Sequence, residues 1–490
     1  MTSHPIRPLA LAISTTLALL ASGCAVGPDY HRPELPVAEH YVETPTEANL
    51  KTEQQVVAAE LPERWWELFR SPALNELVRK GLANSPTVAS AQAALHVAVE
   101  NRLAQQAAYW PTVGLDYAAT RQKVANPLAS PLASAAYVFN LNTVQVNVSY
   151  TPDLFGLNRR QVESLQAQQD SQRWTVEATY LTLSSNLVVA AITEASLRDQ
   201  VAVTRQLIAS QADVLQRYKQ LQSIGQNSAL DIAQQESQLA TLEATLPPLE
   251  KQLALQRDQI KALSGLLPDS PAIAEFRLDQ LTLPEPLPLT LPSSLVEHRP
   301  DVLAAEAQLR SASADIGVAV ANRLPQVTLG VNAWGSSAIS LAKLFSPGTE
   351  FWTLAGSVSQ SVFDGGALKH REAAARAAYY QSAAQYRSTV INAYQNVADA
   401  LEAINADSAA LKAAQRAQDA AERTLTITRR QLELGDVSAL AVIAAEQAEQ
   451  QSTVAMLQAR ANRFMDSAAL CQALGGGWWN RPALASATPE

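Results

Sequence analysis

The chain has 490 residues, of which 47% are apolar, 6% aromatic and 17% charged, and its formal net charge is −9. This balance supplies no broad basic surface for nucleic acid, and two cysteines cannot build a disulfide framework. The composition favours long helices over several compact domains with separate cores.

The first 23 residues have the features of an export signal. Arg7 precedes an apolar stretch at 9–20, and Leu20-Ala21-Ser22-Gly23-Cys24 follows. This pentapeptide resembles the bacterial lipobox, in which the cysteine becomes an acylated N-terminus, although Ala21 stands where leucine is commoner. The alternative is an ordinary signal peptide with an incidental cysteine. We predict lipidation at Cys24, and Ala25 after it resembles lipoproteins sent to the outer membrane.

After Cys24 no stretch of about 18 apolar residues occurs, so the sequence predicts no membrane-spanning helix. Any crossing of a membrane would therefore use strands. Residues 24–71 are predicted to form an anchored, extended N-terminal segment.

The rest of the chain repeats itself. Ser85-Pro86-Thr87-Val88 matches Arg299-Pro300-Asp301-Val302 at an offset of 214, and Gly225, Leu230 and Gly265 match Gly435, Leu440 and Gly475 at an offset of 210. Proline, glycine and leucine residues that recur at a nearly constant offset indicate a duplicated architecture. We predict repeats at 72–283 and 298–477, a proline- and leucine-rich connector at 284–297, and a C-terminal tail at 478–490.

Each repeat has the predicted order helix, strand, loop, strand, very long helix, glycine turn, helix. Residues 156–222 and 366–434 contain no proline and could each extend roughly 100 Å. Gly225 and Gly435 are expected to form the turns at the helical tips.

The helix after Gly225 has a coiled-coil pattern, with leucines alternately three and four positions apart at 239, 242, 246, 249 and 253. Pro247-Pro248 interrupts this pattern and predicts a break or kink, since a proline pair removes helical hydrogen bonds. The second repeat has Leu457-Gln458 at that place.

Four segments alternate apolar and small polar residues with a period of two, which predicts strands at about 111–122, 141–152, 325–335 and 352–363. They form two hairpins, with loops at about 123–139 and 338–351. Their length suits tilted transmembrane strands, and the alternative is a soluble sheet with one face on a core. Four strands cannot close a barrel with a lumen, whereas three chains would supply twelve.

These features together resemble the outer-membrane factor family of tripartite efflux systems of the RND type, in the lipoprotein branch that includes OprM and NodT-type proteins. The resemblance rests on five motifs: Cys24-Ala25-Val26-Gly27-Pro28-Asp29-Tyr30, Trp65-Trp66 with Phe69 and Pro72-Ala73-Leu74, Asp153-Leu154-Phe155-Gly156, Leu230-Asp231, and Ala473-Leu474-Gly475-Gly476-Gly477-Trp478.

The resemblance implies a mainly helical, TolC-like homotrimer with a shared twelve-stranded membrane β-barrel and a long periplasmic helical barrel. Such a channel conducts drugs or other small molecules passively from an inner-membrane pump and a periplasmic adaptor to the exterior. The resemblance also implies contact with outer-membrane lipid, and contact with the adaptor at the tip turns of Gly225 and Gly435. It implies no cofactor and no nucleic acid as partner.

In the family, the closed end is narrowed by a leucine and, four residues on, an aspartate. The matching positions here are Leu440 and Ala444, so the leucine carries over and the carboxylate does not. Glu446 or Asp436 is the alternative source of negative charge, although helical geometry puts Glu446 about 200° round from position 444.

An enzyme is not expected. The six histidines, at 4, 31, 40, 96, 298 and 370, form no metal-ligand spacing, and no phosphate loop or nucleophile elbow occurs. Cys471 is predicted to be a small buried helix residue, and the Trp65-Trp66 and Trp478-Trp479 pairs are predicted to be packing groups.

The competing interpretation is a periplasmic coiled-coil adaptor, which would carry one helical hairpin flanked by β-rich domains. The sequence leaves the cargo open between drugs, aromatic acids and metal ions. Three methionines give no support for a relay of soft metals.

Overall fold

The computed structural model describes residues 25–34, 55–57, 61–123, 138–226, 228–271, 273–284, 286–288 and 297–480. The predicted signal, Cys24 and the loop at 124–137 lie outside this part. Its helices are α3 (Pro72–Asn84), α4 (Pro86–Gln106), α5 (Leu157–Ser223), α6 (Ala229–Glu243), α7 (Leu246–Leu263), α9 (Pro300–Ala321), α10 (Ala367–Glu433) and α11 (Ala439–Ala473). Its strands are β1 (Gln55–Val57), β2 (Thr112–Lys123), β3 (Val138–Tyr150), β4 (Pro286–Pro288), β5 (Gln326–Ala338) and β6 (Glu350–Ser359). Short 3₁₀ turns are η1 (Trp65–Phe69), η2 (Ala107–Tyr109), η4 (Leu278–Gln280), η5 (Leu341–Lys343) and η6 (Trp478–Asn480).

The two long helices, α5 and α10, contain 67 residues each and agree within one residue with the two proline-free runs. An aspartate precedes each of them. The Asp153 carboxylate accepts hydrogen bonds from two backbone amides of the first turn of α5, and the Asp364 carboxylate accepts one from Leu368 of α10. Both carboxylates therefore stabilise a helix N-terminus, where backbone donors are unpaired.

Both helical tips use the same glycine geometry. Gly225 and Gly435 have φ values of 80°, and the residue after each donates its backbone N–H back across the turn, to Leu221 and Gln431. This is the left-handed helix ending that favours glycine. The starts of the next helices differ, because Ser228 and Asp231 form a reciprocal capping box at α6, whereas the Ser438 side chain makes no cap on α11.

The predicted break at Pro247-Pro248 is confirmed. α6 ends at Glu243 and α7 starts at Leu246, so both prolines lie in the first turn of a new helix, where a missing N–H is tolerated. The leucines at 239, 242, 246, 249 and 253 are all half-buried, in line with the predicted seam. In the second repeat, α11 is continuous over 35 residues.

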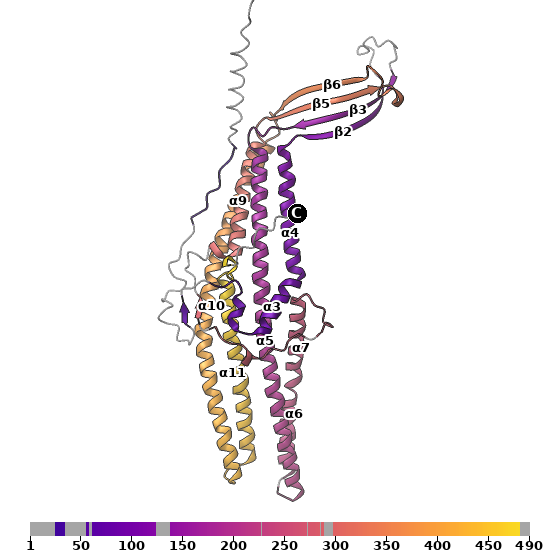
Figure 1. Ribbon diagram of the computed structural model, residues 1–490. Coiled ribbons are helices and arrows are strands. Elements are labelled where there is room, and N and C mark those ends of the chain that lie inside the picture. Colours follow the sequence, from indigo (N-terminus) through magenta and orange to yellow (C-terminus); the bar gives the residue numbers. More distant parts are fainter. Residues whose placement is uncertain are drawn as a thin grey trace, which may run out of the picture. The chain divides into compact units, whose positions relative to one another are not determined.

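The four long strands form one antiparallel sheet with the order β2-β3-β5-β6 (Figure 1). Both predicted hairpins are present, with Leu115 opposite Val146 and Val331 opposite Leu354. The pairing of β3 with β5 joins the hairpins, and register shifts interrupt the ladders after Val146 and after Asn332. β1 and β4 form a separate two-stranded parallel sheet.

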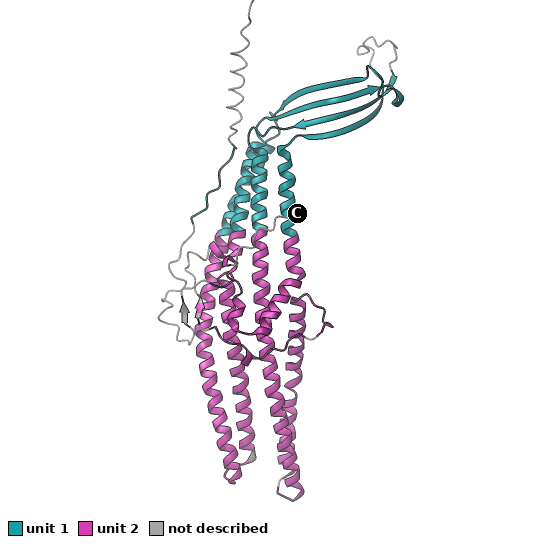
Figure 2. Ribbon diagram, in the orientation of Figure 1, with its two compact units in different colours: residues 1–34, 94–172, 305–386 teal, residues 35–93, 173–304, 387–490 magenta. Residues whose placement is uncertain are grey.

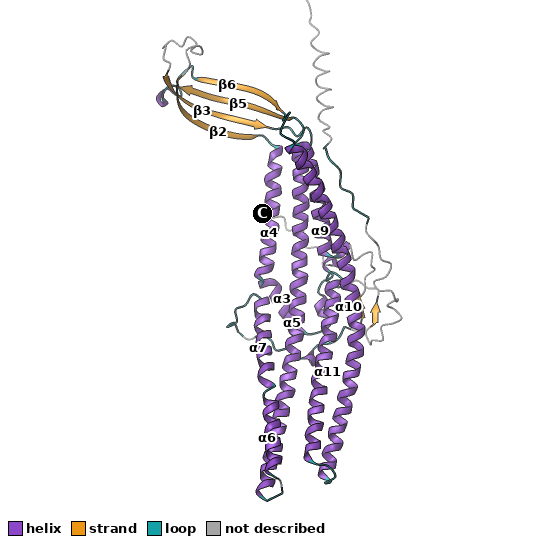
Figure 3. Cartoon of the chain, turned by 180° about the vertical axis from the view of Figure 1, so that it is seen from behind, coloured by secondary structure: helices purple, strands orange, loops and turns teal. Residues whose placement is uncertain are grey.

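The chain divides into two compact units (Figure 2). Unit 1 comprises residues 1–34, 94–172 and 305–386, and unit 2 comprises residues 35–93, 173–304 and 387–490. Each unit therefore takes segments from both predicted repeats. Figure 2 and Figure 3 together show that the four long strands belong to unit 1, whereas the described residues of unit 2 are mainly helical and contain only the short strands β1 and β4.

In unit 2, equivalent residues of the two repeats make equivalent close contacts. Gly265, with φ of 71°, packs against the backbone oxygen of Asn84, and Gly475, with φ of 97°, packs against that of His298. Asn84 and His298 are related by the same offset of 214 that relates the helix starts after them. The duplication therefore extends to backbone packing.

One described helix, α5, contains an 18-residue window apolar enough by composition to cross a membrane, with a mean hydropathy of 1.2. Half of that window is buried inside the chain. A helix with an apolar window that is half buried inside its own chain is typical of a protein core.

Candidate functional site

The long sheet has one apolar face, and its side chains are exposed. Val113 and Leu115 of β2 are 70% and 74% exposed, and Leu354 and Val358 of β6 are 70% and 71% exposed. The register brings the valines of β3 onto the same face. Apolar side chains in a continuous, uncovered patch mark a surface that meets another apolar phase or another chain. The observed exposure disfavours a soluble sheet with this face on a core.

The opposite face is polar and is joined by hydrogen bonds from strand to strand. Asn147 donates to Asp116, Asn332 donates to Gln145 at 2.8 Å, and Thr143 and Ser337 lie 3.0 Å apart through their hydroxyl oxygens. These residues belong to β2, β3 and β5, so the ladder crosses most of the sheet. A sheet with one apolar and one hydrated face suits the wall of a water-filled barrel.

Both edges of this sheet are unpaired among the described residues, and the helices attached to them are also exposed. α4 leads into β2, and within unit 1 its residues 94–106 include no buried side chain. α10 follows β6, and its first buried residue is Tyr386. α9, which leads into the inner strand β5, buries six apolar residues: Val302, Ala307, Leu309, Ala314, Ile316 and Ala321. The two flanks of unit 1 therefore carry open strand edges and uncovered helices.

Residues 25–34 form an extended strap within unit 1. The buried Arg160 side chain of α5 donates to the carbonyl oxygens of Val26 and Gly27 and forms an ion pair with Asp29 at 2.8 Å. Farther along, Arg32 forms an ion pair with Glu306 of α9 at 2.8 Å and donates to the Tyr386 hydroxyl of α10. The strap thereby contacts helices of both repeats.

Two glycines permit the strap to approach the helices through the backbone. A Cβ at Gly27 would lie 2.5 Å from the Gly317 Cα, and a Cβ at Gly156 would lie 2.7 Å from the Ala25 Cα. Gly27 and Gly156 also have positive φ values, of 98° and 76°. The chain segment that follows Cys24 is therefore held against the start of α5.

The helical tips expose apolar side chains in matched pairs. Ile224 and Leu434 are 67% and 66% exposed beside the turn glycines, and Leu230 and Leu440 are 66% and 53% exposed in the next helices. The members of each pair are 210 residues apart. Asp436 is also exposed, next to Gly435.

The candidate gate residues lie on opposite faces of α11. Leu440 and Ala444 are exposed, whereas Glu446 is 2% exposed. The Glu446 carboxylate accepts hydrogen bonds from Gln211 Nε2 of α5 at 2.5 Å and from Arg429 Nη2 of α10 at 2.8 Å. Glu446 thus joins three helices of one chain, and Leu425, Val442 and Ala445 form a small apolar cluster beside it.

A second buried ionic cluster joins α10 and α11. Arg463 is 2% exposed and lies 3.6 Å from Asp466, with Asp407 close enough to interact with both. Burial and the nearby Asp407 carboxylate raise the pKa of Asp466 to about 6. The native state consequently holds this proton at pH values where the unfolded chain has lost it. Stability should fall as pH rises from about 4 to about 6.

We expect Asp466→Asn to stabilise the protein at pH 7.5 and to have no such effect at pH 4, because the amide avoids the cost of ionisation. One pKa unit represents about 1.4 kcal/mol, which sets an upper limit of about 3 kcal/mol per chain. Thermal unfolding of the wild type and the variant at both pH values measures this. A variant less stable than wild type at pH 7.5 would contradict the expectation.

Cys471 and the tryptophan pairs are packing groups, as the sequence predicts. Cys471 is 1% exposed, and burial raises the pKa of its thiol to about 12, so it is inert. Trp65 is buried beside Phe69, and the Trp479 ring stacks on His298 at 4.2 Å. The described residues contain no group of three or more His, Cys, Asp or Glu that could hold a metal ion.

The sequence matches the family model described as outer membrane efflux protein twice, at residues 77–266 and 291–476. The toluene efflux pump outer membrane protein TtgF of Pseudomonas putida is 29% identical over 96% of this chain and 97% of its own length. The pyoverdine export outer membrane protein OpmQ of Pseudomonas aeruginosa is 28% identical, over 85% and 87%. Nodulation protein T of Rhizobium leguminosarum bv. trifolii is 24% identical, over 94% and 96%.

Solved structures give the same result for the fold. The outer-membrane channel OprN superposes with a TM-score of 0.84 at 25% identity, over 93% of this chain and 100% of that one. The CmeC outer membrane channel of Campylobacter jejuni superposes with a TM-score of 0.85 at 19% identity, over 94% and 96%. The TolC-like fold is thereby confirmed.

Proposed function

The chain belongs to the outer membrane efflux protein family, and we propose that three copies of it close their sheets into one barrel of twelve strands. The protein is an outer-membrane channel of a tripartite efflux pump and is not an enzyme. Its cargo is driven by the inner-membrane partner, so the channel conducts passively.

The observation that carries the trimer is the four-stranded sheet with an exposed apolar face and two open edges. Unpaired backbone groups are not tolerated in hydrocarbon, so β2 of one copy must pair with β6 of the next. The uncovered flanks of α4 and α10 would meet at the same contact. Cross-linking tests this arrangement directly, with one cysteine in β2 and one in β6, for example Gly114→Cys with Ser357→Cys. We expect a covalent trimer in the outer-membrane fraction, and a species that stays monomeric would refute the arrangement.

We also propose that Cys24 is acylated. The strap places Ala25 against Gly156 at the start of α5, close to the end of β3, where the membrane surface is expected. An acyl chain on Cys24, the residue before Ala25, would therefore begin at the expected membrane surface.

Cys24→Ser is expected to abolish incorporation of labelled palmitate completely, because no other cysteine is exposed in the described part of the chain. Cys471→Ser is the matched control and should retain the label. A wild-type protein that carries no label would favour the ordinary signal peptide.

The exposed tip residues support an adaptor contact at the turns of Gly225 and Gly435. Ile224, Leu230, Leu434 and Leu440 form two equivalent apolar patches, as expected for a site contacted by repeated copies of one partner. An adaptor itself would have one helical hairpin flanked by β-rich domains. This chain has two hairpins, and its long strands lie between helices.

For the gate, we propose that Leu440 narrows the closed end, that Asp436 supplies exposed negative charge, and that Glu446 acts by holding α11 against α5 and α10. Glu446→Gln should weaken the bond from Arg429 while preserving the shape of the side chain. We expect a severalfold increase in open events in planar bilayers, since a charge-assisted bond contributes about 1.5–3 kcal/mol.

Asp436→Asn is the companion variant and should lower cation selectivity without raising the number of open events. If Glu446→Gln left conductance unchanged, its role in the gate would be dropped.

The relatives named for toluene and pyoverdine export carry chemically different cargo. A wide aqueous lumen discriminates little, so we propose that the inner-membrane partner selects the substrate. Susceptibility testing of a deletion strain with organic solvents, antibiotics, aromatic acids and metal salts would identify the class.

A further inference from the structure

The apolar face of the long sheet ends in basic side chains. The four strands of this sheet contain four charged residues, which are Asp116, Arg121, Lys123 and Glu350. Asp116 lies on the polar face, where Asn147 donates to it. Arg121 and Lys123 follow Leu115 at even intervals along β2, so they lie on the apolar face. They are its last members before the hairpin connection, at the end of β2 opposite the one that joins α4 (Figure 1).

The two cations of β2 have no counter-ion within their own chain. Both side chains are exposed, and within the described part of the chain neither has an ion-pair or hydrogen-bond partner. Glu350, the carboxylate at this end of the apolar face, starts β6 at the other edge of the sheet. In sequence, the hairpin connections at 124–137 and 339–349 contain no acidic residue and one basic residue, Lys343.

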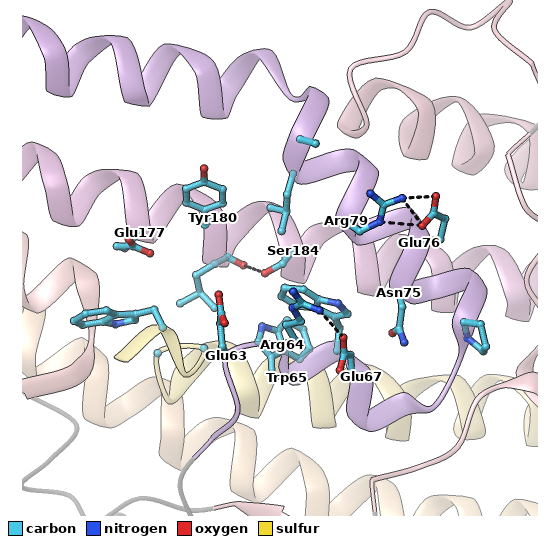
Figure 4. Close-up of a pocket in the computed structure, with 18 residues that line it drawn as sticks. Glu63, Arg64, Trp65, Glu67, Asn75, Glu76, Arg79, Glu177, Tyr180 and Ser184 are labelled. Atoms are coloured by element: carbon cyan, nitrogen blue, oxygen red, sulfur yellow. Dashed lines mark hydrogen bonds and ion pairs between the residues drawn. The ribbon is translucent and has the colours of Figure 1, made fainter. Parts of the chain in front are cut away.

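Charged residues in unit 2 are arranged differently, as a cavity of about 800 Å³ beside Trp66 illustrates (Figure 4). There Glu76 contacts Arg79 at 2.7 Å and Lys80 at 3.1 Å, and Arg64 lies 3.5 Å from Glu67. The charges of this cavity are thus neutralised by neighbours in the same chain. The cations at the end of β2 require a partner from outside it.

The connection between β5 and β6 folds over the same end of the apolar face. Trp334 lies opposite Val146, which places it on this face, and the exposed Phe345 ring stacks on it with 6.2 Å between centroids. The Ser336 hydroxyl fixes the connection by donating to the Leu344 carbonyl oxygen. Exposed aromatic rings at the edge of an apolar band are typical of the boundary between hydrocarbon and lipid headgroups.

Closure of the barrel brings the basic residues of two copies together, a step that rests on the trimer proposed above. Lys343 is exposed in η5, within the connection that leads into β6. Because β6 of one copy pairs with β2 of the next, Lys343 lies beside Arg121 and Lys123 of the neighbouring copy. Glu350 adds one negative charge at this junction. Three cations and one carboxylate leave a net charge of +2 at each junction.

We propose that each junction between copies binds a phosphate-bearing lipid of the outer leaflet. Its phosphate contacts Arg121 and Lys123 of one copy and Lys343 of the next, and its acyl chains lie on the apolar face. Guanidinium and ammonium groups are the usual partners of phosphate, and their long stems can lie along apolar surface while the charge stays at headgroup level. A lipid fits better than a soluble anion, because the basic residues continue a face that already meets hydrocarbon.

Native mass spectrometry of the purified full-length trimer tests this site. The probes are diphosphoryl lipid A, which carries phosphates and acyl chains, and phosphatidylcholine, which carries acyl chains but no net charge. We expect one lipid A per junction and binding of phosphatidylcholine at least about tenfold weaker, equivalent to about 1.4 kcal/mol. Arg121→Gln combined with Lys123→Gln should weaken lipid A by at least about the same factor.

Two matched variants separate the charge from the fold. Lys369→Gln with Arg371→Gln makes the same change of charge at the same spacing near the start of α10, where both residues are exposed, and should leave binding unchanged. Arg121→Lys with Lys123→Arg keeps the charges and should bind lipid A as the wild type does.

The same spectra report the mass of the assembly, so loss of lipid and loss of trimer are seen separately. A trimer that binds both lipids equally, binds lipid A unchanged in the glutamine variant of β2, or loses it equally in the α10 variant would overturn the lipid site and leave the barrel standing. Displacement of lipid A by excess inorganic phosphate would identify a soluble anion as the ligand instead. A chain that is not trimeric would overturn both the barrel and the site.

Discussion

Leu115→Lys is expected to reduce the amount of trimer in the outer membrane by at least about tenfold, because a lysine facing lipid near mid-membrane costs about 2–4 kcal/mol per chain. Leu115 lies near the middle of the apolar face of β2, opposite Val146, and is 74% exposed. Three copies would each carry the charge, so the effect is multiplied in the assembled barrel. Heat-modifiable trimer in outer-membrane fractions, quantified on gels, measures it.

Ala118→Lys provides the matched control for Leu115→Lys. Ala118 lies three residues along the same strand but on the polar face, opposite Thr143. A lysine there would face the aqueous lumen, so we expect normal assembly and a shift of ion selectivity toward anions. If both lysine variants assembled equally well, the apolar face would not be in contact with lipid, and the barrel would have to be abandoned.

Features encoded by short-range patterns were predicted closely from the sequence. The long helices follow from the absence of proline over 67 residues, and the break before Pro247 follows from local chemistry. The ends of the strands are predicted less accurately than the ends of the long helices. Alternation continues to Val362, but pairing stops at Ser359, because its partner Gln326 is the first residue of β5. Val362 is consequently 97% exposed beyond the strand.

Features that depend on contacts between distant residues could not be predicted. The hydrogen bond between Gln211 and Glu446 joins residues 235 positions apart, so no local pattern indicates it. The helical period indicates only that Glu446 lies on a different face of the helix from Leu440. The pairing of β3 with β5, the Arg160 contacts to the strap and the cavity beside Trp66 are also long-range. Gly27 carried a signal in the sequence, as part of the Cys24-Ala25-Val26-Gly27 motif, but nothing local indicates that Gly317 is its partner.

Gly27→Ala is expected to release the strap and to lower the thermal stability of the trimer by several degrees. The added Cβ would lie 2.5 Å from the Gly317 Cα, and φ of 98° is unfavourable for alanine. Backbone atoms cannot yield as a flexible side chain can, so the strap must move away. Arg160, which is 4% exposed while the strap is seated, would then lose its bonds to Val26 and Gly27. Each hydrogen bond that involves a charged group contributes about 1.5–3 kcal/mol.

Gly348→Ala separates the clash from the backbone strain. Gly348 has φ of 88°, but nothing lies within 4 Å of an added Cβ. The Gly348→Ala variant should therefore lose about 1 kcal/mol of stability from the unfavourable positive φ, with no added cost from a steric clash. Hydrogen exchange of residues 25–34 distinguishes the two variants, because Val26 donates to the Phe155 carbonyl only while the strap is seated. Faster exchange there is expected for Gly27→Ala alone. If the two substitutions had equal effects, close packing of Gly27 on Gly317 would not be what holds residues 25–34 in place.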